Sequence, residues 1–150
     1  MNLISRAIVI NDNKLLVINR NKYGFKFVTI PGGHIEKNES PEETVIRETF
    51  EETSIKIANP RLIITEIFNK DYDQQFIFLC KYISGEPAIQ PETNESISNR
   101  LGQNLYSPNW LDIAKIKEAN ILPVELKDKL ISYLSEEFPK EPIKLQINLR

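Results

Sequence analysis

The sequence predicts an α+β fold in which helices cover a central mixed β-sheet. Three features predict it: β-rich runs fill the N-terminal half, one strongly signalled helix interrupts them, and a second helical pattern closes the chain. Strands interrupted by one helix and closed by another typically pack in layers around one core. With 150 residues, 41% hydrophobic and 27% charged, the chain is expected to form one domain over residues 1–150.

The N-terminal strands are predicted by β-branched and apolar runs between turn residues. Ala7–Ile10 and Leu15–Ile18 flank Asn11-Asp12-Asn13, a pattern typical of a hairpin. Phe25–Ile30 is expected to form a third strand. This strand leads directly into the glycine-rich loop Pro31-Gly32-Gly33.

The central helix is expected from Pro41 to about Thr53. Ser40 precedes the proline, and Glu43 follows three residues after Ser40. This is a capping box with proline at the first helical position, a strong start signal. One mostly apolar arc is expected to face the core. That arc consists of Val45, Ile46, Thr49, Phe50 and Thr53.

The second half contains weaker signals. Leu62–Phe68 and Gln75–Ile83 are expected to be strands around a polar turn, Asn69–Asp73. The remaining expected elements are a long polar loop over Pro87–Gly102, a short strand over Tyr106–Leu111, and helices over Asp112–Glu118 and Val124–Phe138.

Three glutamates on the central helix are the first chemical signal. Glu48, Glu51 and Glu52 are spaced so that their side chains lie together, beside the core-facing arc. Like charges at this spacing repel, and the C-terminal end of a helix also disfavours anions. A charge cluster is usually a solvated face. A divalent cation would nevertheless make the arrangement favourable, since half-shielded carboxylates bind such ions well.

The segment from Gly33 to Ile55 resembles the signature of the Nudix hydrolases, G-x5-E-x7-R-E-U-x-E-E-x-G-U, where U is bulky and apolar. The matching residues are Gly33, Glu39, Arg47, Glu48, Glu51, Glu52 and Ile55. Thr49 stands at the first U position and can still pack on an apolar face. Ser54 stands at the family's glycine and is less suited to a left-handed helix end.

The resemblance implies a Nudix-like α/β/α sandwich and a metal site for Mg²⁺ or Mn²⁺. It assigns the ligands to the side chains of Glu48, Glu51 and Glu52 and to the carbonyl of Gly32. The residues that would brace the motif are Gly33, Glu39 and Arg47. Family members often add an acidic residue from a later loop as ligand or general base. Glu92 is the first candidate for that role and Glu95 the second, with Glu48 as a rival base.

Three further residues are candidates for substrate binding. Arg20 and Lys26 flank the strand before the glycine loop, where they could hold phosphates. His34 follows the loop directly and is the single histidine of the chain. Contact with a phosphate and a neutral place in the loop both stay open for it.

The function implied by the resemblance is divalent-metal-dependent hydrolysis of the diphosphate linkage in a nucleoside diphosphate linked to a group X. Candidates for such a compound include a nucleoside triphosphate and a nucleotide sugar. The alternative is a catalytically weak nucleotide-binding or sensing module on the same fold, against which the intact glutamates argue. The expected partner is therefore a nucleotide-type small molecule. A homodimer stays open.

Composition and charge limit the other classes of function. The net charge of −2 implies no broad attraction to nucleic acids or to anionic membranes. The sequence contains no apolar run of membrane-spanning length, and Met1–Ile4 does not read as a signal peptide. A cytoplasmic protein is therefore expected. The lone Cys80 cannot form an internal disulfide and is expected to be a small buried residue.

Overall fold

The computed structural model describes residues 2–68, 73–91 and 93–148. Its elements, in chain order, are β1 (Leu3–Asn11), β2 (Lys14–Lys22), β3 (Phe25–Thr29), β4 (Gly32–His34), α1 (Pro41–Thr53), β5 (Lys56–Phe68), β6 (Asp73–Ser84), α2 (Asn94–Leu101), β7 (Asn104–Asp112), the 3-10 helix η1 (Ile113–Glu118), α3 (Val124–Ser135) and β8 (Ile143–Ile147).

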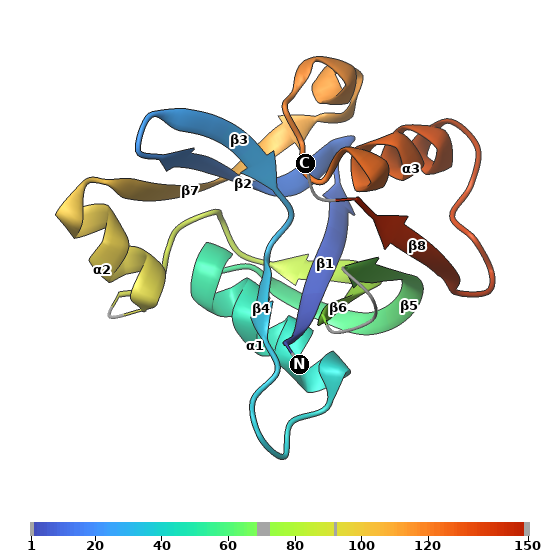
Figure 1. Cartoon of the computed structure of the whole chain (residues 1–150), viewed down its shortest axis with the longest axis horizontal. Helices are drawn as coiled ribbons and strands as arrows, with labels where there is room; N and C mark the ends of the chain where they lie inside the picture. The colour runs from blue at the N-terminus through green and yellow to red at the C-terminus, as the bar shows by residue number, and fades with distance from the viewer. Residues whose placement is uncertain (1, 69–72, 92, 149–150) are drawn as a thin grey trace.

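The strands form one mixed sheet, as the sequence predicts. Its order is β3-β2-β1-β6-β5-β8, with β4 paired to β1 and β7 paired to β2 (Figure 1). The pairs β1–β6 and β5–β8 are parallel and the other pairs are antiparallel. The predicted α+β class with a mixed sheet is therefore confirmed.

The first hairpin is confirmed with its turn chemistry. Asp12 and Asn13 have φ angles of 52° and 58°, and Asn11 pairs with Lys14 across the turn. Two consecutive left-handed residues make the tight turn that matches the twist of the flanking strands. Asparagine and aspartate tolerate this conformation better than most residues.

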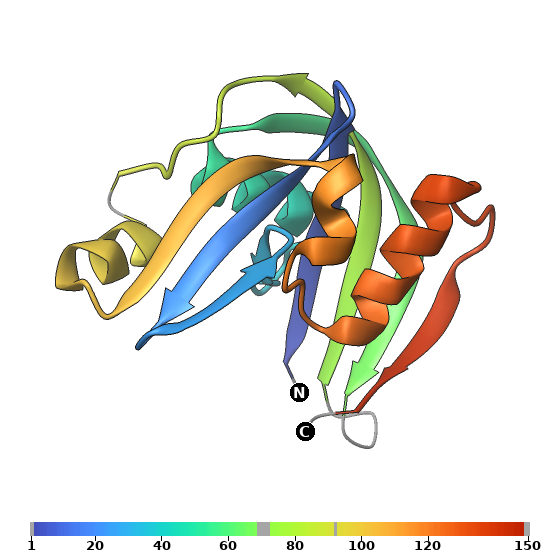
Figure 2. The ribbon, with the colours of Figure 1, turned by 90° about the horizontal axis from the view of Figure 1, so that it is seen from above.

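Helices cover both faces of the sheet. Figure 2 shows α1 on one side of the strands, with η1 and α3 on the other. Alternate residues of β1 point to the two sides, because Val9 packs with Val45 of α1 whereas Ile8 packs with Leu126 and Leu130 of α3. Two apolar cores therefore form. Among the described residues, none of the helices is long and apolar enough to cross a membrane.

Helix α1 begins and ends where the sequence predicts, but its buried face is rotated. Both hydrogen bonds of the capping box between Ser40 and Glu43 are present. Most of the predicted arc is at least partly buried, but Ile46 is 40% exposed. Glu52 is buried instead of Ile46, because the helix packs against β4 as well as against β1 and β5.

Several expectations for the second half are wrong in detail. The range Pro87–Gly102, expected to be a loop, contains α2, and β8 was not anticipated. The closing helix ends at Ser135 and not at Phe138, and the helix expected over Asp112–Glu118 is of the 3-10 type. Of the expected turn Asn69–Asp73, residues 69–72 lie outside the described part.

Candidate functional site

Two glycines of β4 allow close contact among β1, β4 and α1. Gly32 pairs with Arg6 of β1, and a Cβ atom at Gly32 would overlap the backbone of Ser5 and Arg6. A Cβ atom at Gly33 would overlap the carboxylate of Glu48. Figure 1 shows β4 running between the labels of β1 and α1. Glycine is needed at both positions because the neighbouring groups occupy the space of a side chain.

Three carboxylates converge beside these glycines. Glu48, Glu52 and Glu95 each place one oxygen within 4.8 Å of the other two. Glu48 and Glu52 come from successive turns of α1, and Glu95 comes from α2. Glu52 is further fixed by the N–H of Gly32, which donates to its Oε1 at 2.8 Å. The family resemblance predicts Glu48 and Glu52 as metal ligands. Glu95 is the second candidate, after Glu92, for an acidic residue from a later loop.

Glu51 does not join this cluster. Its side chain is 39% exposed, and its carboxylate lies 3.3 Å from Nη1 of Arg47. Neighbouring residues on a helix point about 100° apart, so Glu51 and Glu52 cannot both face β4. The structure therefore brings Glu48 and Glu52 together and places Glu51 at the exposed edge of the carboxylate cluster.

The cluster is electrostatically unfavourable without a cation. Burial, with smaller contributions from the nearby Glu95 and Glu48, raises the pKa of Glu52 to about 8, although the N–H of Gly32 opposes the shift. Burial also raises the pKa of Glu48, against the opposing effect of Arg47. A divalent ion would offset this repulsion. Hard cations such as Mg²⁺ prefer carboxylate oxygens, so the donor set fits the ion.

Arg47 braces the glycine loop against α1. Its Nε and Nη2 donate to the two oxygens of Glu39 at 2.7 and 3.0 Å. Its Nη1 donates to Glu48 at 2.9 Å, and its Nη2 also reaches the carbonyl of His34 at 3.2 Å. The hydrogen bond from Arg47 lowers the pKa of Glu39 to about 2, with a smaller contribution from Thr44. A planar guanidinium suits this two-point grip.

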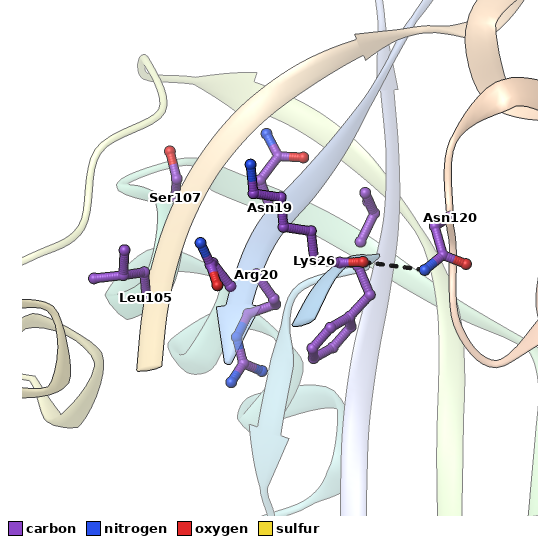
Figure 3. A pocket seen from close by; sticks show the side chains of 9 residues that line it. Asn19, Arg20, Lys26, Leu105, Ser107 and Asn120 are labelled. Atoms are coloured by element: carbon purple, nitrogen blue, oxygen red, sulfur yellow. Dashed lines mark hydrogen bonds between the residues drawn. The ribbon is translucent and has the colours of Figure 1, made fainter. Parts of the chain in front are cut away.

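Of the three predicted substrate residues, Arg20 and Lys26 line the same cavity, whereas His34 is not part of its lining. Arg20 stacks on Tyr106, with its guanidinium carbon 3.7 Å from the ring centroid. Lys26 lies opposite Asn21 in the ladder, and Figure 3 shows it on the same side of the strands as Asn19, away from the guanidinium of Arg20. The side chain of His34 is exposed. Glu92 lies outside the described residues, so its place is not given.

Two cavities lie within the described part of the chain near these strands. One of about 440 Å³ is lined by Arg20 and Lys26 together with Asn19, Ser107 and Asn120, among others (Figure 3). The second, of about 430 Å³, lies at the start of α3. Its polar lining includes Arg6, Thr29, Gln75, Glu125 and Asn148. Nothing in the sequence singled out Arg6, because its role depends on the contact of β1 with Gly32.

Comparison with known proteins agrees with this geometry. The sequence matches the NUDIX domain over residues 1–127. It is 31% identical over 99 residues to the NAD-capped RNA hydrolase NudC of Photorhabdus laumondii subsp. laumondii, a match covering 66% of this chain and 34% of NudC. The chain thus spans about a third of the length of the curated relatives that it matches.

Solved structures share the fold. The Nudix hydrolase of Nitrosomonas europaea superposes with a TM-score of 0.72 at 18% identity, covering 99% of this chain and 79% of that one. A UDP-X diphosphatase superposes with a TM-score of 0.65 at 20% identity, covering 96% of this chain and 66% of that one. Similarity at this level of identity shows the fold alone.

Proposed function

The chain belongs to the Nudix family, and from this premise we propose that it is a pyrophosphohydrolase that uses a divalent metal ion. Its substrate would be a nucleoside diphosphate linked to a second group X. Water would cleave the diphosphate linkage and release two phosphorylated products. The observation that carries this proposal is that carboxylate oxygens of Glu48, Glu52 and Glu95 lie within 4.8 Å of one another beside β4.

The three carboxylates are proposed to hold Mg²⁺ or Mn²⁺. Glu52 is nearly buried and oriented by Gly32, and Glu48 is oriented by Arg47. Ligands that are held by other groups keep their geometry when the ion binds. We expect Glu51, at the rim, to contribute mainly negative charge. The carbonyl of Gly32 remains an expected ligand on the strength of the family resemblance.

When bound, the ion would neutralise phosphate charge and make a coordinated water more acidic. Glu95 is proposed to accept a proton from the attacking water through the carboxylate oxygen that does not bind the ion. Glu48 is paired with Arg47 and Glu52 with Gly32, whereas Glu95 has neither of these partners and approaches from a separate helix. The ion pair between Arg47 and Glu39 would hold β4 and α1 in fixed positions relative to each other.

The cavity at the start of α3 is the proposed place for the nucleoside or for X. Arg6 connects this cavity to β4, because Arg6 lines the cavity and also pairs with Gly32. Its volume of about 430 Å³ falls within the range of small-molecule sites. The guanidinium of Arg6 donates to Gln75 at 2.6 Å and to the carbonyl of Ile30 at 3.1 Å, which fixes its position.

The test is a product-release screen with Mg²⁺ or Mn²⁺. The panel should contain nucleoside triphosphates, nucleotide sugars, ADP-ribose, dinucleoside polyphosphates and NAD-type dinucleotides. We expect turnover of at least one compound, abolished by EDTA. Glu52→Gln should lower kcat by about two orders of magnitude or more, the scale of losing a preorganised electrostatic group.

A matched control separates this effect from general damage. Glu42→Gln changes an exposed glutamate of the same helix and should leave turnover within about twofold of the wild type, as expected for a surface change far from the chemistry. Tight binding of one compound without turnover would support the sensing module instead. Turnover that persists in EDTA and in Glu52→Gln would refute the proposed mechanism.

A further inference from the structure

Ser54 occupies the position at which the family signature has glycine. It takes the left-handed conformation that ends α1, with φ of 63° and ψ of 12°. This conformation is unfavourable for residues with a Cβ atom. The serine hydroxyl makes two bonds that glycine cannot make. It donates to the carbonyl of Ala88 at 2.6 Å and accepts from Nε2 of Gln90 at 2.6 Å.

The segment that Ser54 contacts connects β6 to α2. Figure 1 shows it passing the C-terminal end of α1. The N–H of Ala88 donates to the carbonyl of Thr53 at 2.8 Å, and the N–H of Gln90 donates to the carbonyl of Glu51 at 3.0 Å. These bonds satisfy carbonyls that the last turn of a helix otherwise leaves free. The segment is therefore attached to the end of α1 by backbone and side-chain bonds together.

The attachment continues from this segment into α2. The hydroxyl of Thr93 donates to the carbonyl of Gln90 at 3.0 Å. The hydroxyl oxygen of Thr93 also accepts a hydrogen bond from the N–H of Ser96 at 3.1 Å. Thr93 is the N-cap of α2, so Glu95 follows in the first turn. Gln90 thus links Ser54 to the beginning of the helix that carries the third carboxylate.

Helix α2 has little apolar packing to hold it in place. None of its residues is buried. Its far end is held to β7 by Asn99, which exchanges two hydrogen bonds of 2.7 Å with the backbone of Tyr106. Polar contacts at the two ends therefore determine where the helix lies. The position of Glu95 depends on them.

We propose that the Ser54 hydroxyl is a positioning group, which with Gln90 fixes the start of α2 to the end of α1 and so holds Glu95 beside Glu48 and Glu52. The expected effect on metal binding rests on the proposed function. Glycine would fit the backbone at this position better than serine. It would leave the loop with its two backbone bonds only.

The test compares Ser54→Gly with the wild type. Hydrogen exchange of α2 amides, measured without metal, should become several-fold faster, whereas exchange in the middle of α1 should not change. Mn²⁺ affinity, measured by calorimetry, should fall about three- to tenfold, the factor expected for losing about one net hydrogen bond. Gln90→Ala should behave alike. The thermal midpoint of the metal-free protein should not fall, because glycine suits the left-handed end.

Two controls decide whether Ser54 acts through Glu95. Asn59→Gly relaxes another left-handed residue, with φ of 51°, and should change neither readout. In a Glu95→Gln background, Ser54→Gly should cause no further loss of Mn²⁺ affinity, because coupled residues are not additive.

The outcomes are separable. Unchanged exchange in α2 would overturn the positioning role, and so would an equal loss of Mn²⁺ affinity with and without Glu95. If the wild type binds no Mn²⁺, the proposed metal-dependent function fails. The exchange measurement still decides the role of Ser54 in that case.

Discussion

A carboxylate beneath α3 makes a sharp prediction about stability. Glu66 of β5 is fully buried, and neither of its oxygens has a hydrogen-bond partner among the described residues. Burial raises its pKa to about 7, although Arg6 opposes the shift, and Glu125 adds to it. A buried charge without a partner is costly, so the group prefers to stay protonated in the folded protein. We predict that Glu66→Gln changes how stability depends on pH.

The magnitude follows from the two pKa values. At pH 4, below both pKa values, the carboxyl is mostly protonated in the folded and unfolded chains, and it contributes little pH dependence. Between its ordinary value of 4.5 and about 7, the unfolded chain releases the proton while the folded chain retains it. Stability therefore falls as pH rises through this window. The loss reaches about 3 kcal/mol above pH 7, at about 1.4 kcal/mol for each unit of pKa.

The assay is urea unfolding of the wild type and Glu66→Gln at pH 4 and pH 8. The variant should gain about 3 kcal/mol relative to the wild type between the two pH values. Any constant cost of the buried amide cancels in this difference. Glu118→Gln, at an exposed position, serves as the matched control and should show no such gain. A difference for Glu66→Gln that is the same at both pH values would refute the reasoning.

Three further predictions concern the site. Gly33→Ala should lower kcat/KM by about two orders of magnitude, since its methyl group would displace the Glu48 carboxylate; steady-state kinetics on the best substrate checks this. Arg47→Lys keeps the charge but cannot grip both oxygens of Glu39, so urea unfolding should show a loss of about 1–2 kcal/mol. Mg²⁺ at about 100 times its dissociation constant should stabilise the wild type by about 2.7 kcal/mol, seen as a rise in Tm that EDTA reverses and Glu52→Gln lacks.

Local signals explain what the sequence predicted well. The start of α1 was predictable because Ser40, Pro41 and Glu43 act within one turn of it. The turn at Asp12 and Asn13 was predictable because these residue types tolerate left-handed angles. In both cases the cause and the structure lie within a few residues, so no knowledge of tertiary contacts was required.

Elements fixed by distant partners were not predictable in the same way. Helix α2 has no buried face, so its sequence lacks the apolar period that marks a helix. Its signals, Thr93 as N-cap and Gly102 in the left-handed conformation, also occur in loops. Strand β8 alternates in burial, but it pairs in parallel with β5, which lies about half of the chain length earlier in the sequence. Such pairing depends on the assembled sheet.

The carboxylate cluster likewise combines residues that local spacing predicts with residues whose place depends on tertiary contacts. Glu51 and Glu52 lie three and four residues after Glu48, so helical spacing places both near it, and only the rotation of the helix distinguishes them. The burial of Val45, Thr49 and Thr53 sets that rotation and turns Glu52 towards Gly32. Glu51 is left on the side of Arg47. The third member, Glu95, comes from a helix whose position rests on polar contacts, so the sequence offered it only as the second candidate, after Glu92.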